Sequence, residues 1–152
     1  MFHPAPVRMP TPGLAAMLAV FALVTGCAAS DPPSVSAHAG LSCVDDSPEC
    51  IGRRQQALRQ FTSDHSRAWV RQPASAEAYA SGVRMFAFKT KKKELSCDEL
   101  AHGQREAHAA PGVLRGPSAK GLTTTQVARG IMFAEEVGKE LGREMGRRCR
   151  RG

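Results

Sequence analysis

The stretch Leu122–Cys149, LTTTQVARGIMFAEEVGKELGREMGRRC, carries a long helical pattern with an explicit start signal. Thr123 and Gln126 have the spacing of a capping box, in which each side chain bonds the backbone N–H of the other residue. Leu122 and Val127 flank this box as a hydrophobic staple. We therefore predict a helix from the box to the end of the stretch, about 25 residues or 37 Å at 1.5 Å per residue.

Three further segments combine a helix start signal with apolar residues at helical spacing. Ser47 precedes a proline and opens a helix to about residue 62. Ser75 opens a second helix through about Lys91, and Ser96 with Glu99 forms a second capping box that opens a third. No segment shows a convincing period of two, so the predicted class is all-α. Short connections favour antiparallel neighbours and hence a small four-helix up-down bundle. The apolar positions expected on the inner faces of the first two helices are Ile51, Leu58, Phe61, Tyr79, Val83 and Phe86.

Small residues recur at every fourth position of the last predicted helix, at Gly130, Ala134, Gly138, Gly142 and Gly146. A glycine inside a helix costs up to about 1 kcal/mol relative to alanine, so we expect another contribution from this ridge to offset the cost. Small side chains let another helix approach closely, and we expect that helix to belong to the same domain. An oligomer contact or a membrane-facing groove along Gly130, Gly138, Gly142 and Gly146 is the alternative.

The amino-terminal part of the chain has the pattern of an export signal. The apolar run 14–24 is too short to span a bilayer, and Arg8 supplies a positive flank. The run ends in LVTGC, residues 23–27, which resembles the lipobox of bacterial lipoproteins. The resemblance implies removal of the signal peptide 1–26 and diacylglyceryl modification of Cys27. An ordinary export signal that contains a cysteine, or an uncleaved buried helix, is the alternative, and translation could start at Met1 or Met9.

Cysteine parity favours the same interpretation. The chain has 5 cysteines, and an odd thiol in an exported protein needs an explanation. With Cys27 assigned to lipid, Cys43, Cys50, Cys97 and Cys149 form an even set for two disulfides, with all four expected at one pole of the bundle. Of the three connectivities that four cysteines allow, we favour the pairs 97–149 and 43–50. The expected organisation is a signal peptide (1–26), a lipidated flexible tether (27–42) and a helical domain (43–152).

Two basic clusters are expected at the same pole of the bundle. Removal of residues 1–26 takes away one of the 21 basic residues and leaves 14 acidic ones, a net charge of about +6. Cations at helix ends are favoured by the helix dipole alone, so a solvated helix terminus is the simpler interpretation. The functional alternative is an anionic envelope partner: lipid head groups, lipopolysaccharide or cell-wall polymer. Nucleic acid is not expected, because the clusters lack interleaved aromatic residues and export removes the protein from it. The cluster residues are Lys89, Lys91, Lys92, Lys93, Arg147, Arg148, Arg150 and Arg151.

Candidate residues for chemistry are few. Glu99 and His102 form one E-x-x-H pair, whereas a di-iron bundle needs two such pairs and further glutamates, so no metal or cofactor is predicted. The chain lacks the motifs of a serine nucleophile. Trp69 is expected to close the end of the bundle, and the segment 111–121 is expected to be a long connecting loop.

The sequence therefore predicts a non-enzymatic, lipid-anchored protein of the bacterial cell envelope. The basic pole of its helical domain would contact an anionic surface or an envelope assembly. The absence of an aspartate directly after Cys27 suggests the outer membrane, facing the periplasm. An envelope hydrolase acting on cell wall or lipid is the alternative, and a pocket that contained Glu99, His102 and another carboxylate would favour it.

Overall fold

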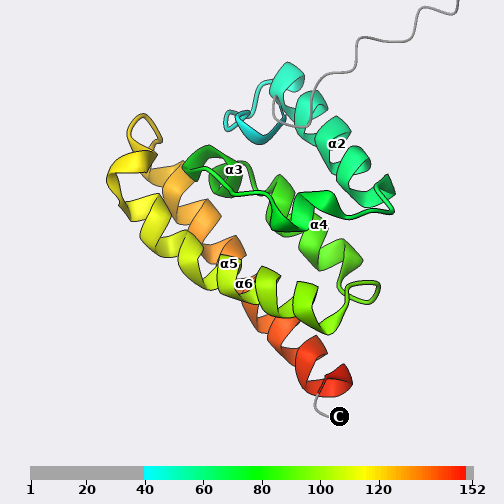
Figure 1. Cartoon of the computed structure of the whole chain (residues 1–152). Helices are drawn as coiled ribbons and strands as arrows, with labels where there is room; N and C mark the ends of the chain where they lie inside the picture. Colours follow the sequence, from blue (N-terminus) through cyan, green and yellow to red (C-terminus); the bar gives the residue numbers. More distant parts are fainter. Residues whose placement is uncertain (1–39, 150–152) are drawn as a thin grey trace, which may run out of the picture. The chain divides into compact units, whose positions relative to one another are not determined.

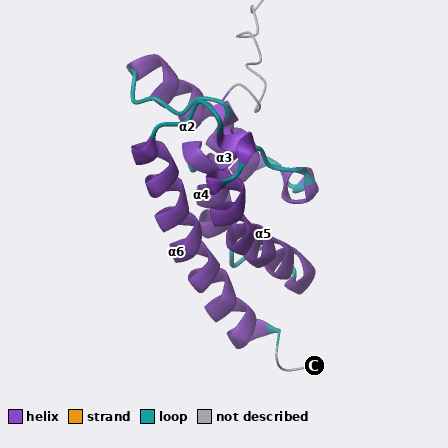
Figure 2. Ribbon diagram, turned by 90° about the vertical axis from the view of Figure 1, so that its left-hand side faces the viewer, coloured by secondary structure: helices purple, strands orange, loops and turns teal. Residues whose placement is uncertain are grey.

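The computed structural model describes residues 40–149 (Figure 1). The predicted signal peptide, Cys27 and nearly all of the tether lie outside the described residues, as do Arg150 and Arg151. The described part is helical and contains no strand, so the predicted all-α class is confirmed (Figure 2). Its elements in chain order are α2 (Pro48–Ser63), the 3₁₀ turn η1 (Ala68–Arg71), α3 (Ala76–Ser81), α4 (Val83–Lys91), α5 (Cys97–Arg115), the 3₁₀ turn η2 (Pro117–Ala119) and α6 (Thr124–Arg148).

The predicted helix starts are all confirmed. The side chains of Ser47, Ser75, Ser96 and Thr123 each accept a hydrogen bond from the backbone N–H three residues further on. Both predicted capping boxes are complete, because the side chains of Glu99 and Gln126 also accept hydrogen bonds from the backbone N–H groups of the N-cap residues Ser96 and Thr123. These caps satisfy backbone donors that a helix start otherwise leaves without a partner.

The predicted second helix is wrong in one respect, because it is divided into α3 and α4. The division lies at Gly82, whose φ of 74° is left-handed and ends α3. Glycine adopts this conformation without the steric cost that a Cβ atom imposes. The described residues therefore contain five α-helices in place of the four expected from the sequence.

The expected loop 111–121 is also wrong at its first half. Helix α5 continues through Pro111 to Arg115, and only a short connection containing η2 separates it from α6. Proline removes one backbone N–H from the helix ladder. The buried side chains of Ala110 and Leu114, which are 0% and 1% exposed, hold this turn of α5 against the core nevertheless.

Helices α5 and α6 form an antiparallel hairpin; α3 and α4 pack on this hairpin, and α2 packs on α4 (Figure 1). The ridge of small residues on α6 faces α5, as the sequence favoured. A Cβ atom added at Gly138 would lie 3.3 Å from Cβ of Ala107, and one at Gly130 would lie 2.9 Å from Cδ1 of Leu114. Gly142 approaches the Gln104 side chain in the same way, whereas a Cβ at Gly146 would meet nothing within 4 Å. The glycines thus allow the two helices to pack closely.

The core is aromatic at its centre. Trp69 is 2% exposed, stacks on Phe61 at a centroid distance of 5.3 Å and meets the ring of Phe88 edge-on at 4.8 Å. Such pairs add about 0.5–1.5 kcal/mol beyond the area they bury. Trp69 therefore belongs to the core itself, between α2 and α4.

The four cysteines pair as the sequence favoured, but they do not share one pole. Cys97 and Cys149 are joined with a Cα–Cα distance of 5.8 Å, where α5 begins and α6 ends. Cys43 and Cys50 are joined with a Cα–Cα distance of 5.2 Å, at the start of α2.

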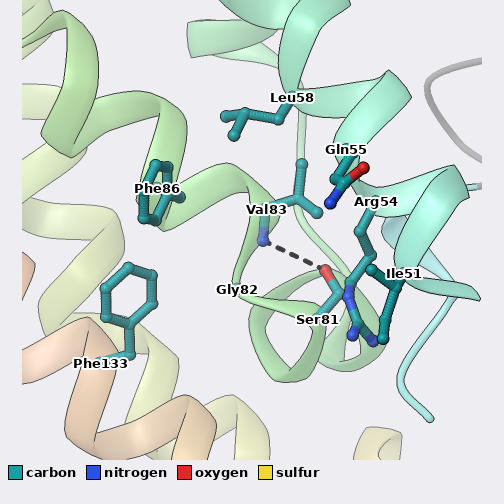
Figure 3. Close-up of a pocket in the computed structure, with 9 residues that line it drawn as sticks. All are labelled: Ile51, Arg54, Gln55, Leu58, Ser81, Gly82, Val83, Phe86 and Phe133. Atoms are coloured by element: carbon teal, nitrogen blue, oxygen red, sulfur yellow. Dashed lines mark hydrogen bonds between the residues drawn. The ribbon is translucent and has the colours of Figure 1, made fainter. Parts of the chain in front are cut away.

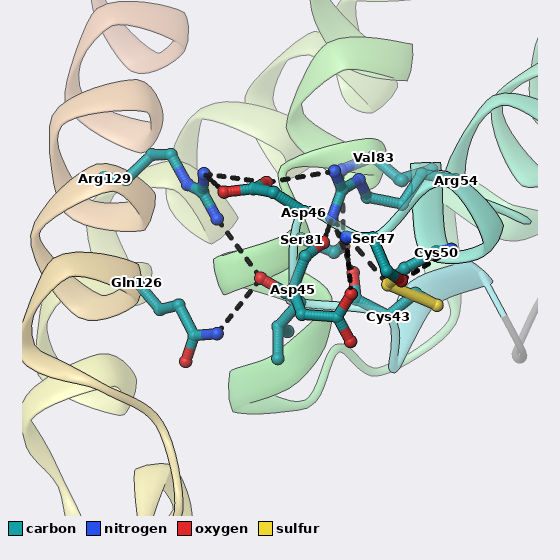
Figure 4. A network of polar contacts seen from close by, with 11 residues as sticks. Cys43, Asp45, Asp46, Ser47, Cys50, Arg54, Ser81, Val83, Gln126 and Arg129 are labelled. Atoms are coloured by element: carbon teal, nitrogen blue, oxygen red, sulfur yellow. Dashed lines mark hydrogen bonds and ion pairs between the residues drawn. A yellow bond between two sulfur atoms is a disulfide. The ribbon is translucent and has the colours of Figure 1, made fainter. Parts of the chain in front are cut away.

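This second disulfide closes a small loop that packs against the beginning of α6 (Figure 4). Gln126 donates a hydrogen bond of 3.1 Å to the Val44 carbonyl, and Arg129 forms an ion pair of 3.2 Å with Asp46. Arg54 of α2 also bonds to Asp46, at 3.4 Å. We call this set of contacts the clasp. Because the clasp holds residues 43–47 at the start of α6, the two disulfides lie at opposite ends of that helix, and the predicted shared pole is wrong.

Candidate functional site

The described residues of the two basic clusters predicted from the sequence lie together, where α4 and α6 end. Arg148 donates hydrogen bonds to three backbone carbonyls that follow α4: those of Lys92 at 3.2 Å, Lys93 at 2.9 Å and Leu95 at 3.0 Å. These carbonyls have no helical partner of their own, so the Arg148 guanidinium caps the carboxyl end of α4 and the turn that follows it. We call this end of the domain, with the cluster residues it carries, the basic pole.

Carboxylates neutralise most of the basic pole. Six of the predicted cations are described, and only Lys93 lacks a carboxylate partner among the described residues. The four carboxylates reduce the charge of this described group to about +2. The pairs are Lys89 with Glu136 (2.6 Å) and Glu140 (3.3 Å), Lys91 with Glu94 (2.8 Å), Lys92 with Glu140, and Arg147 and Arg148 with Glu144.

The pairing also stabilises the charged forms of its members. Hydrogen bonds from Lys92 and Lys89 lower the pKa of Glu140 in spite of some desolvation. Hydrogen bonds to Glu136 and Glu140 raise the pKa of Lys89. Exposed pairs of this kind contribute little to stability, typically below about 1 kcal/mol. Their main consequence here is that Lys89 and Lys92 are already engaged within the domain.

An apolar groove that the sequence analysis did not predict lies between α2 and the junction of α3 with α4 (Figure 3). Phe86 and Phe133 line one side and Ile51 the other, around a volume of about 250 Å³. Phe86 and Ile51 are 46% and 38% exposed, although both were expected on inner faces. The break at Gly82 explains Phe86, since it rotates α4 relative to the helical period of α3.

Glu99 of the E-x-x-H pair caps the start of α5 and pairs with Arg67. Glu99 accepts a hydrogen bond of 2.7 Å from the Ser96 N–H and another of 2.9 Å from Arg67 Nε. Burial alone would raise the pKa of Glu99. The combined effect of these hydrogen bonds is larger, so the pKa of Glu99 is lowered. His102 lies beside Glu106, with 3.8 Å between Nε2 and Oε2. Within residues 40–149 no group of three or more His, Cys, Asp or Glu side chains is arranged to hold a metal ion.

A buried ion pair was also missed by sequence reasoning. Arg84 is 1% exposed and bonds to the Glu106 carboxylate through both Nε and Nη2, the latter at 2.7 Å. The same Nη2 also lies within hydrogen-bond distance of the carbonyls of Val70 at 3.0 Å and Gln72 at 2.6 Å, and Nη1 donates to that of Trp69. One guanidinium thus ties the chain around η1 to α4 and α5. The only sequence signal is its position inside the apolar run VRMFAF (83–88).

No helix among the described residues is long and apolar enough to cross a membrane. Comparison of the chain with protein-family models, with curated proteins and with solved structures gave no match.

Proposed function

We propose that this is a non-enzymatic, lipid-anchored protein of the bacterial cell envelope that presents a disulfide-bonded helical domain on a short tether. The observation that supports this proposal is the assignment of the five cysteines. Four of the 5 cysteines form two disulfides inside the domain, so Cys27 is the one that remains. It stands at the end of LVTGC, where a bacterial lipoprotein carries its diacylglyceryl group.

The basic pole is the proposed contact with an anionic surface, and its strength follows from its charge. A juxtamembrane cation contributes about 1 kcal/mol against an anionic surface, so a net charge of about +2 supplies roughly 2 kcal/mol. An interaction that weak does not hold a protein at a surface by itself. The anchor is therefore an essential part of the proposal, because it raises the effective concentration of the domain near the surface that the pole contacts.

The position of the pole favours a partner other than the anchoring membrane. The described chain begins at Gly40, which packs against Arg53 and Ala57 of α2. The pole is at the far end of α6, about 28 Å beyond the clasp for the 19 residues from Arg129 to Arg148. If the residues from Cys27 to the start of the described chain form a flexible coil, their mean span is about 20 Å. Cell-wall polymer is therefore a better candidate than the lipid surface into which Cys27 would insert.

The anchor is tested by replacing the modified cysteine. Cys27→Ala should abolish acylation, leave an unprocessed precursor and alter fractionation, while the disulfides of the domain form as before. Intact-mass measurement of protein extracted from membranes provides the readout. A wild-type product that lacks the diacylglyceryl mass, or that begins elsewhere than at residue 27, would contradict the proposal.

The contact is tested with charge-matched variants. Lys91→Gln with Lys93→Gln removes two charges from the pole, while Arg59→Gln with Lys120→Gln removes two exposed charges elsewhere. Co-sedimentation with isolated, anionic cell-wall polymer should fall several-fold for the first pair and little for the second. An equal loss for both pairs would show that only the net charge matters, and the pole would lose its proposed role.

One observation favours the alternative of an envelope hydrolase. Asp98, Glu99 and His102 line a hollow of about 230 Å³ beside α5, as a site with acid–base groups would require. Both oxygens of Glu99 already accept hydrogen bonds, however, which argues for a structural carboxylate. Hydrolysis of cell-wall polymer or lipid by the wild type, lost in Glu99→Gln without loss of stability, would establish this alternative.

A further inference from the structure

A second hollow adjoins the first one and has a different chemical character. It lies between the outer face of α5 and the end of η1 with the chain that follows it, and its volume is about 330 Å³. Arg71 and Gln72 line it from one side, and His102 and Arg105 from the other. Tyr79 of α3 also lines it. Three separate elements thus contribute hydrogen-bond donors to one concave surface.

The two arginines are not used within the domain. Arg71 and Arg105 are exposed, and neither forms a hydrogen bond or an ion pair with its side chain among residues 40–149. The carboxylate on the wall of this hollow, Glu106, is bound by the buried Arg84. Asp98, which has no ion pair within residues 40–149, lines the neighbouring hollow and not this one. Two unpaired guanidinium groups therefore face a space whose own carboxylate is already neutralised.

Tyr79 adds an independent observation. Only 5% of Tyr79 is exposed, and this residue lines the hollow. Burial, reinforced by the nearby Glu106, raises the pKa of Tyr79 to about 12, so the phenol keeps its proton. Because Tyr79 lines the hollow, its hydroxyl is placed to interact with whatever occupies that space. The hydroxyl then donates a hydrogen bond to that ligand.

We propose that this hollow binds a phosphate-bearing ligand, with Arg71 and Arg105 as its charged donors and Tyr79 as a neutral one. A guanidinium presents paired N–H groups that match two oxygens of a phosphate, and charge-assisted bonds of this type are strong. The volume accommodates a phosphate group with a small organic substituent. Arg84 is a positioning residue, because it fixes Glu106 and the backbone of η1 without facing the ligand. The site is distinct from the basic pole and does not depend on lipid at Cys27.

Titration of the full-length chain in neutral detergent tests the proposal directly. Isothermal titration calorimetry with inorganic phosphate and with glycerol 1-phosphate should show saturable binding at a single site. Vesicles of phosphatidylcholine with and without phosphatidic acid form the second arm. Stronger binding of the soluble ester assigns the site to a small molecule, whereas a preference for phosphatidic acid vesicles assigns it to a lipid head group; either result supports a phosphate site.

Variants decide whether the hollow is responsible. Arg71→Gln and Arg105→Gln should each weaken binding at least tenfold, and Tyr79→Phe several-fold. Arg115→Gln and Lys120→Gln remove exposed charges elsewhere and should change affinity by less than twofold. Both arginine variants are at the surface, so unchanged circular dichroism is expected and separates a binding defect from misfolding. The proposal is overturned by an absence of saturable binding to every phosphate probe, or by an equal loss in the two control variants.

Discussion

Replacing Gly103 by alanine tests how closely the hairpin of α5 and α6 is packed against α4. Gly103 is buried in the middle of α5. A Cβ atom at this position would lie 2.6 Å from Cδ1 of Phe88 and 3.0 Å from Cδ1 of Leu141. Both of those side chains are 0% exposed, so neither can move into solvent to make room.

The expected effect is the difference between two opposing terms. Alanine is more favourable than glycine in a helix by up to about 1 kcal/mol. An extra methyl group in a well-packed core costs typically about 1–3 kcal/mol. Because the contacts here are far shorter than van der Waals distance, we expect the second term to prevail. Gly103→Ala should therefore destabilise the protein by roughly 1–2 kcal/mol.

Gly112 provides a matched control on the same helix. A Cβ atom there would meet nothing within 4 Å, so only the helix-propensity term remains. Gly112→Ala should stabilise the protein by about 0.5–1 kcal/mol. Urea denaturation with both disulfides intact measures the two changes in the free energy of unfolding. Stabilisation by Gly103→Ala comparable to that of the control would refute the close packing of α4 on this hairpin.

Three further changes probe the covalent and electrostatic framework. Cys149→Ser opens a loop with a sequence separation of 52 and should remove roughly 4 kcal/mol of stability on the chain-entropy estimate, which a fall in the thermal midpoint and one free thiol would reveal. Glu106→Gln leaves the buried Arg84 without a counter-charge and should cost about 3 kcal/mol in urea denaturation, whereas a cost below about 1 kcal/mol would contradict the pairing. Lys92→Met should raise the pKa of Glu140, as measured by carboxyl NMR titration. Since that pKa is lowered in the folded state, the contribution of Glu140 to stability exists above its ordinary value of 4.5 and is lost as the pH falls through the folded-state pKa, and the variant should lose less stability in acid.

Local signals in the sequence predicted where helices begin, and they succeeded for a physical reason. The N-caps at Ser47, Ser75, Ser96 and Thr123 satisfy donors within three residues, so the information is contained in each short segment. The passage of α5 through Pro111 depended instead on burial of that turn by the rest of the fold. A break such as that at Gly82 also depends on packing, because glycine is tolerated within helices as well as at their ends.

The same distinction applies to the candidate sites. The cysteine pairs followed from spacing and helix order, but their placement at two ends depended on the clasp, a contact between residues about 80 positions apart. The basic clusters were visible in the sequence, whereas the carboxylates that neutralise them required the register of α4 on α6. Arg84 and Tyr79 gave no polar signal of their own, since both follow the apolar period of the core.

The clasp also determines how the domain is connected to its proposed anchor. The described chain is held at its start by the packing of Gly40 on α2 and by the loop closed by Cys43 and Cys50. Arg129 and Gln126 bind this loop to α6, and α6 is joined at its other end to α5 by the second disulfide. The clasp and the basic pole are consequently connected through one continuous helix. This arrangement keeps the basic pole at a fixed distance from the loop 43–50, the end of the domain to which the proposed tether leads.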